Sequence, residues 1–241
     1  DFDWNISLNL AHNENEVTRL SNDVFTMDKI LLGDVFIRGG SSSGTHVLEE
    51  GRPIGQFYGL VCNGIDENGR YIMVDKDGDG EISDPADYDY IGSAQPKLTY
   101  GITNTFRYKN FDLSFFLRGT IGNDILNATR MAYAQSGFLP GTNALDDPLT
   151  YTLSETPRFS NYYLEKGSFM RLDNLTLGYK IKALNGIRVY FTAQNLFVIT
   201  KYKGLDPEVP MDSGDGLTPG VEPREFYPKA RTFSVGLNLN F

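Results

Sequence analysis

The last eleven residues of the sequence, 231–241, alternate between apolar and small polar side chains without interruption. The apolar set takes every second position: Phe233, Val235, Leu237, Leu239 and Phe241. Successive side chains of a β-strand point to opposite faces of a sheet, so this strand has one apolar face and one small, polar face. A soluble sheet packed on a core gives the same alternation. An apolar face toward lipid and a polar face toward a wet lumen is also the pattern of a strand in a membrane barrel.

The same alternation recurs in segments of roughly 9–13 residues, the length that a tilted strand needs to cross a bilayer. These segments are 2–10, 98–107, 111–118 and 174–181. Phe116 interrupts the polar side of one segment, and the stretch 187–199 is apolar on both sides in places. We therefore expect an all-β chain of antiparallel strands that belong to a membrane barrel.

The connections between these segments alternate in length. Residues 109–110 and 183–186 are short turns, whereas 123–167 and 200–229 are long linkers. Barrels of the bacterial outer membrane have short periplasmic turns and long extracellular loops, and a soluble sandwich has no reason to alternate in this way. We expect the two long linkers and the segment 65–96 to be extracellular, and the two short turns to be periplasmic.

Composition excludes several classes of function. The formal net charge of −9 argues against a nucleic-acid partner, because such partners require a basic face. The single cysteine, Cys62, permits no intrachain disulfide, and no apolar run approaches the ~18 residues of a membrane helix. His12 and His46 have no metal-ligand spacing, and no acid, base and nucleophile form a recognisable set, so we expect no enzyme. The strand pattern begins at once, without a signal peptide, which predicts a mature product or a C-terminal piece.

An acidic stretch at 75–83 has the residue order of a calcium-binding loop. Asp75, Asp77 and Asp79 hold positions 1, 3 and 5 of an EF-hand-type loop. Gly80 at position 6 permits the sharp turn, and Glu81 at position 7 offers its backbone carbonyl. Calcium prefers many oxygen ligands in flexible geometry, so the stretch predicts a Ca²⁺ site.

The loop departs from that order at position 12, where a bidentate acid belongs and the sequence has Ala86. Asp87 or Asp84 closes the site if the chain bulges at Pro85. The alternative is a solvated acidic turn that binds no metal tightly. The flanking residues do not form two amphipathic helices, so we expect a structural ion that stiffens an extracellular loop rather than a calcium sensor.

An ordered set of phrases resembles one family of transporters. They include EGRPIGQFYG at 50–59, NGIDENG at 63–69, IGSAQPKLTYG at 91–101, YKNFDL at 108–113, GSFMRLDNLTLGY at 167–179, QNLF at 194–197 and GLDPE at 204–208. In this order they are similar to the C-terminal barrel region of the SusC/RagA-like TonB-dependent outer-membrane transporters of Bacteroidetes. The resemblance covers nearly all of residues 1–241 and is weakest at 13–45 and 123–165.

The resemblance implies a barrel of about 22 strands with a plug in its lumen. We count roughly seven to nine strands, and neither plug nor TonB box is visible here, so the chain is expected to be part of a longer one. Such transporters are multi-pass proteins of the bacterial outer membrane that import glycan fragments or peptides beneath a SusD-like surface lipoprotein. The TonB complex supplies their energy through the N-terminal region. Phe241 resembles the aromatic end by which assembly machinery recognises such barrels.

Aromatic residues of the long linkers are candidate contacts for substrate or for the lipoprotein lid, since aromatic rings stack on sugars and on peptide side chains. The candidates are Tyr133, Phe138, Tyr151, Phe159, Tyr162 and Tyr163. Each ring could instead pack the loops. Basic residues on the predicted lumen side are expected to pair with Asp112 and Asp173 along the wall: Arg107, Arg118, Arg171 and Lys180.

The alternative function is a soluble, calcium-stabilised β-rich domain that binds carbohydrate at the cell surface. It explains the acidic loop and the β content, but neither the alternating loop lengths nor the terminal aromatic residue.

Overall fold

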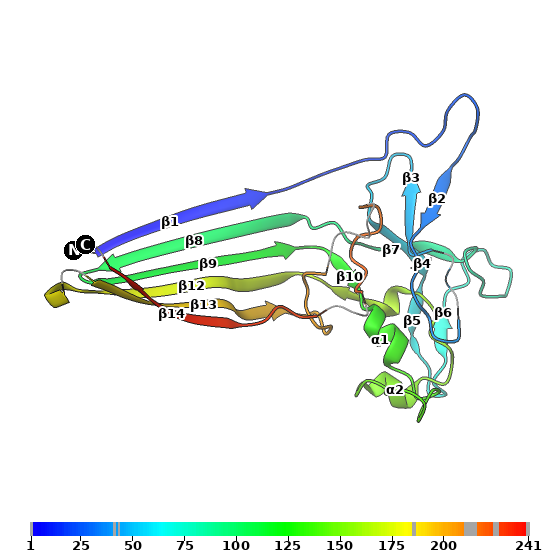
Figure 1. Ribbon diagram of the computed structural model, residues 1–241. Coiled ribbons are helices and arrows are strands. Elements are labelled where there is room, and N and C mark those ends of the chain that lie inside the picture. The colour runs from blue at the N-terminus through cyan, green and yellow to red at the C-terminus, as the bar shows by residue number, and fades with distance from the viewer. Residues whose placement is uncertain are drawn as a thin grey trace.

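The computed structural model describes residues 2–40, 42, 44–184, 187–209, 216–223 and 227–239. Long strands form an open, curved sheet, and a lobe of shorter elements lies at one end of it (Figure 1). All strand pairs within the sheets are antiparallel and the helices are few and short, so the prediction of an all-β antiparallel fold is confirmed. No helix in the described residues is long and apolar enough to cross a membrane.

The large sheet has six strands in the order β1-β8-β9-β12-β13-β14. Their bounds are β1 Phe2–Ala11, β8 Leu98–Tyr108, β9 Phe111–Ile121, β12 Phe169–Ile181, β13 Ile187–Thr200 and β14 Thr232–Asn238. The long sheet has fewer strands than the seven to nine that we counted from the sequence, because the segments at 29–93 form a separate lobe, and the described residues contain fourteen strands in all. The sheet does not close, and β1 and β14 are its two edges.

The strand register collects the apolar residues on one face. Val235 on β14 pairs with Phe191 on β13, and Phe191 pairs with Leu177 on β12. This face is exposed in the chain, with 77% of Val235 accessible. The face also holds one buried amide, Asn104, which accepts a hydrogen bond from the Trp4 indole at 3.1 Å.

The opposite face is polar, and long side chains on it lie over glycines of neighbouring strands. The Phe116 ring covers Gly101, which explains why an aromatic residue interrupts the polar side. A Cβ atom on Gly236 would lie 2.4 Å from the Tyr190 ring. These glycines therefore make room for bulky side chains on the lumen-type face.

The two-sided apolar stretch in β13 comes from an irregularity in the ladder. The register between β12 and β13 shifts between Leu172 and Asn174, and Asn195 has a φ of 51°. A bulge adds a residue to a strand and changes which face the next side chains occupy. The alternation is thus interrupted without ending the strand.

The lobe contains three small sheets and the helices. The first has the order β2-β3-β4-β7, with β2 Lys29–Leu32, β3 His46–Glu49, β4 Gln56–Leu60 and β7 Tyr88–Ser93. The others pair β5 Cys62–Ile65 with β6 Tyr71–Met73, and β10 Asp124–Leu126 with β11 Leu164–Lys166. The helices are α1 Ala128–Tyr133, α2 Pro148–Thr152 and the 3₁₀ turn η1 Asn161–Tyr163, and a second turn, η2 Lys182–Leu184, follows β12.

The buried apolar core lies in this lobe rather than on the long sheet. Its fully buried members include Phe57, Leu60, Tyr88, Met131 and Phe159. They come from β4, β7, α1 and the segment before η1, so segments up to a hundred residues apart meet here. Burial of this apolar surface stabilises the lobe.

The connections follow the predicted alternation. The turn 109–110 lies at the end of the sheet opposite the lobe, and η2 lies at that same end (Figure 1). The segments 12–97, 122–168 and 201–231 join the long strands at the lobe end. Phe241 lies outside the described residues.

Candidate functional site

The acidic loop brings three carboxylates together. One oxygen from each of Asp75, Asp77 and Asp87 lies within 4.8 Å of the others, a spacing that could hold a metal ion. The carboxylates of Asp79 and Glu81 are not in this cluster. The loop is therefore closed by Asp87, one residue after the position of a standard EF-hand acid.

Backbone amides aim the Asp87 carboxylate into the loop. Asp87 is buried and accepts hydrogen bonds from the amides of Lys76 at 2.6 Å and Ser83 at 2.7 Å. Bonds from the amides of Ser83 and Lys76 lower the pKa of the Asp87 carboxyl, so it is ionised at neutral pH. The other candidate, Asp84, is instead paired with Arg158 at 2.6 Å.

The predicted aromatic contacts are divided between core and surface. Tyr163 and Phe159 are completely buried, so a direct surface contact was wrong for them, because the lobe's core forms around these rings. Tyr162 is half-buried beneath the Arg130 guanidinium. Phe138 and Tyr151 are exposed and stay candidates for contact with substrate or lid.

Tyr133 is half-buried and belongs to a small exposed cluster. The Arg38 guanidinium lies 5.3 Å from the ring centre of Tyr133 and 5.0 Å from that of Phe138. The Thr142 hydroxyl accepts a hydrogen bond from the same guanidinium. Two of the predicted contact residues therefore share one cation–π site, which stays a prediction as a contact surface.

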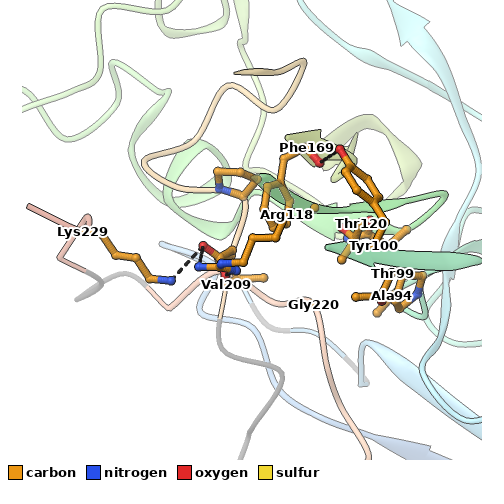
Figure 2. Close-up of a pocket in the computed structure, with 14 residues that line it drawn as sticks. Ala94, Thr99, Tyr100, Arg118, Thr120, Phe169, Val209, Gly220 and Lys229 are labelled. Atoms are coloured by element: carbon orange, nitrogen blue, oxygen red, sulfur yellow. Dashed lines mark hydrogen bonds and ion pairs between the residues drawn. The ribbon is translucent and has the colours of Figure 1, made fainter. Parts of the chain in front are cut away.

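A cavity of about 260 Å³ lies where the polar face of the sheet meets the lobe (Figure 2). Thr99, Arg118, Thr120 and Phe169 of the long strands line one side. The other side is formed by residues around 94–96, 207–209, Gly220 and Lys229. A molecule that passes along the polar face would meet this cavity at the lobe end.

Glu208 is the centre of the charges at this cavity. Its carboxylate accepts hydrogen bonds from Arg118 and, at 2.8 Å, from Lys229. Both of these cations are labelled in Figure 2. Burial raises the pKa of the Glu208 carboxyl and the bonds from Arg118 and Lys229 lower it, with a net result below the ordinary value. Arg118 also pairs with Asp173 at 2.9 Å, as the wall-charge prediction expected.

A buried ion pair adjoins this network. Arg171 and Asp206 each expose 4% of their side chains and lie 2.6 Å apart. Arg171 Nε is also 2.7 Å from Glu208, within ion-pair range, although the atom lacks a well-aligned hydrogen bond. Three acids balance three cations here, so the cavity has little net charge to attract an ion.

Sequence reasoning missed Asp206 and Glu208, which lie in a long linker without periodic pattern. It also missed Arg188, which forms an ion pair with Asp112 at 2.5 Å, while the predicted partner Arg107 lies directly opposite Asp112 on β8. The motif GLDPE at 204–208 contributes to the family resemblance. It also supplies Asp206 and Glu208, which bind Arg171 and Arg118 on the long strands.

Comparison with known proteins agrees with this architecture. No family model matches the chain. TonB-dependent receptor SusC of Bacteroides thetaiotaomicron is 35% identical over 260 residues, covering 100% of this chain and 25% of the receptor. TonB-dependent receptor P3 of Formosa agariphila is 32% identical over 287 residues, covering 100% of this chain and 27% of that protein. The chain thus spans about a quarter of the length of these relatives.

Solved structures show the same fold. The RagAB peptide transporter matches with a TM-score of 0.74 and 25% identity, over 98% of this chain and 27% of the other. The open-open state of the RagAB peptide importer matches with a TM-score of 0.71 and 24% identity, over 98% of this chain and 26% of the other. These proteins are receptors and transporters rather than enzymes. From its sequence and its fold together, the whole chain is similar to one part of the SusC/RagA-like TonB-dependent receptors.

Proposed function

We propose that the gene product containing this sequence is a multi-pass β-barrel of the bacterial outer membrane that imports nutrients. The observation that carries the proposal is the six-stranded sheet, with an exposed apolar face and a polar face lined by charged residues. Apolar side chains such as Val235 and Phe2, 77% and 61% exposed, suit lipid. In a soluble domain this face would be a large uncovered apolar patch.

The imported molecules are glycan fragments or peptides, taken up with a SusD-like lipoprotein and energised by the TonB complex. Support comes from the relatives, which include SusC and the RagAB peptide transporter. The long connections at one end of the sheet offer the surface for substrate and lipoprotein, with Phe138 and Tyr151 as exposed aromatic contacts. A soluble calcium-stabilised carbohydrate-binding domain is less well supported, because no residue that the structure describes covers the apolar face of the long sheet.

Cell fractionation tests this proposal. An antibody against this chain should detect a band in the outer membrane that is larger than 27.0 kDa and migrates differently when unboiled. Deletion of the gene should abolish uptake of the imported glycan or peptide, and reintroduction should restore it. A soluble band near 27.0 kDa would refute the membrane assignment.

The acidic loop has the structural role of binding Ca²⁺ in this proposal. Asp75, Asp77 and Asp87 supply carboxylate oxygens, and the three lie on one short segment that precedes β7. A cation there would offset the repulsion between the carboxylates and hold the loop in one conformation.

A further inference from the structure

A second cavity, of about 230 Å³, lies in the lobe between α1, the residues 145–147 and the segment 203–205. Its volume is far above the ~10–15 Å³ that one water requires, so it has room for part of a ligand. It lies where two long linkers meet, 123–167 and 200–229. Glu222 forms part of its wall.

Glu222 is an acid that is only 1% exposed. Its oxygens accept from the amides of Thr129 and Leu205, both at 3.3 Å, which are long hydrogen bonds. Glu222 takes part in no ion pair between residues that the structure describes. A buried carboxylate without a cation is costly, so this group is suited to an incoming positive charge.

The groups around Glu222 are hydroxyls, which both donate and accept hydrogen bonds, and a cation that is already paired. The Thr129 hydroxyl is buried and has no hydrogen-bond partner. Arg130, the nearest fixed cation of the cavity wall, is already paired with Asp147 at 2.9 Å. Burial, then the charge of Glu222 and a hydrogen bond to its carboxylate, raise the pKa of the Tyr202 hydroxyl, so this hydroxyl lies beside Glu222 as a neutral donor. The carboxylate thus has neutral hydrogen-bond donors but no cation as a partner among the described residues.

Lys203 is the one cation of the wall that could compete for this role, among the described lining residues. Its side chain is exposed, and its backbone amide is held by Glu165 at 2.7 Å. A turn of this side chain into the cavity would neutralise Glu222 and leave no place for a ligand cation. The experiment below distinguishes these two arrangements.

We propose that this cavity binds the primary ammonium group of a ligand, with Glu222 as the counter-ion and the Thr129 hydroxyl as a further acceptor. An ammonium has three donors, which matches two carboxylate oxygens and a hydroxyl. The ammonium could come from a peptide N-terminus or from an amino sugar. The biological use of this site rests on the proposed import function. The binding itself does not, because it is measured on the purified protein.

The test is calorimetric titration of the complete gene product in detergent. The probes are alanyl-alanine and glucosamine, each compared with its N-acetylated form. We expect acetylation to weaken binding at least tenfold for one probe, and which probe responds identifies the source of the ammonium. Glu222→Gln should remove this difference, whereas Glu67→Gln, an exposed acid outside the cavity, should preserve it.

Equal affinity for free and acetylated probes, or no binding of any probe, would overturn the proposal. Lys203→Met tests whether Lys203 is the native partner of Glu222. Ammonium binding that is seen only in this variant would show that Lys203 occupies the site in the unaltered protein, and would also overturn the proposal. The comparison of probes on the unaltered protein needs no variant, so a misfolded Glu222→Gln would not prevent a decision. Loss of uptake on gene deletion tests import separately.

Discussion

Replacing Arg171 by methionine tests how the lobe is fixed to the sheet. The change keeps most of the side-chain volume but removes the cation that faces Asp206, whose side chain is 4% exposed. Among the described residues, Asp206 then keeps the amide of Glu208, which donates at 2.9 Å, as its hydrogen-bond partner. Breaking a buried pair by removing one partner costs about 3–5 kcal/mol. Glu208 loses less, because it retains Arg118 and Lys229.

Such a cost should be visible as local opening rather than as loss of the whole barrel. At about 1.4 kcal/mol for each factor of ten, 3 kcal/mol corresponds to roughly a hundredfold faster amide hydrogen exchange. The measurement is exchange followed by mass spectrometry on peptides covering 202–209, in the complete gene product in detergent. Arg188→Met is the matched control, because Arg188 pairs with Asp112 at the far end of the same face.

The reasoning would be refuted by less than a tenfold acceleration at 202–209, or by an equal acceleration in both variants. A second variant separates the two possible causes. Arg171→Met combined with Asp206→Leu removes both charges, and replacement of a buried pair by apolar groups is often neutral. Exchange in this double variant should return most of the way to the original rate.

Three further predictions concern the loop, the pH and the sheet. Asp87→Asn should weaken Ca²⁺ binding at least tenfold, measured by terbium luminescence with chelator-treated protein as the blank. Folding lowers the pKa of the Glu208 carboxyl, so its contribution to stability is complete above the ordinary pKa of 4.5 and is lost as the pH falls through the pKa in the folded protein. Amide exchange at 202–209 should therefore accelerate on acidification. Glu208→Gln should make this exchange less dependent on pH. Gly236→Ala should lower the free energy of unfolding in detergent by about 1–3 kcal/mol, because the new Cβ would lie 2.4 Å from the Tyr190 ring, whereas Gly137→Ala, with open space around it, should not.

Periodicity made the long strands predictable, since side-chain alternation is a local property of the chain. The two-residue turn after Tyr108 and the collection of long linkers at one end followed from the same pattern. The lobe was not predictable in this way, because its core joins residues such as Phe57 and Phe159 that are distant in sequence. The bulge near Asn195 was also not predicted, because asparagine tolerates a positive φ but a single asparagine within a strand is too weak a signal to mark a bulge.

The candidate site was predictable only where its groups lie close together along the chain. Asp75, Asp77 and Asp87 are within one short segment, so the cluster could be anticipated, and the structure selects Asp87 rather than Asp84 through its backbone hydrogen bonds. The partner of Arg171 lies 35 residues away in an aperiodic linker. No local pattern encodes such a pairing, because it depends on where the linker returns to the sheet.

Two consecutive residues, Leu205 and Asp206, connect the cavity that contains Glu222 to the long sheet. The amide of Leu205 donates to Glu222 in the cavity, and the side chain of Asp206 holds Arg171 on β12. A ligand that neutralises Glu222 acts on the same backbone turn that the buried ion pair fixes. If the turn moves when Arg171 is replaced by methionine, ammonium binding should weaken together with the protection of 202–209. Arg188→Met should change neither, because its ion pair lies at the opposite end of the strands. Parallel loss of both properties in the first variant alone would indicate that the cavity depends on the attachment of the lobe to the sheet.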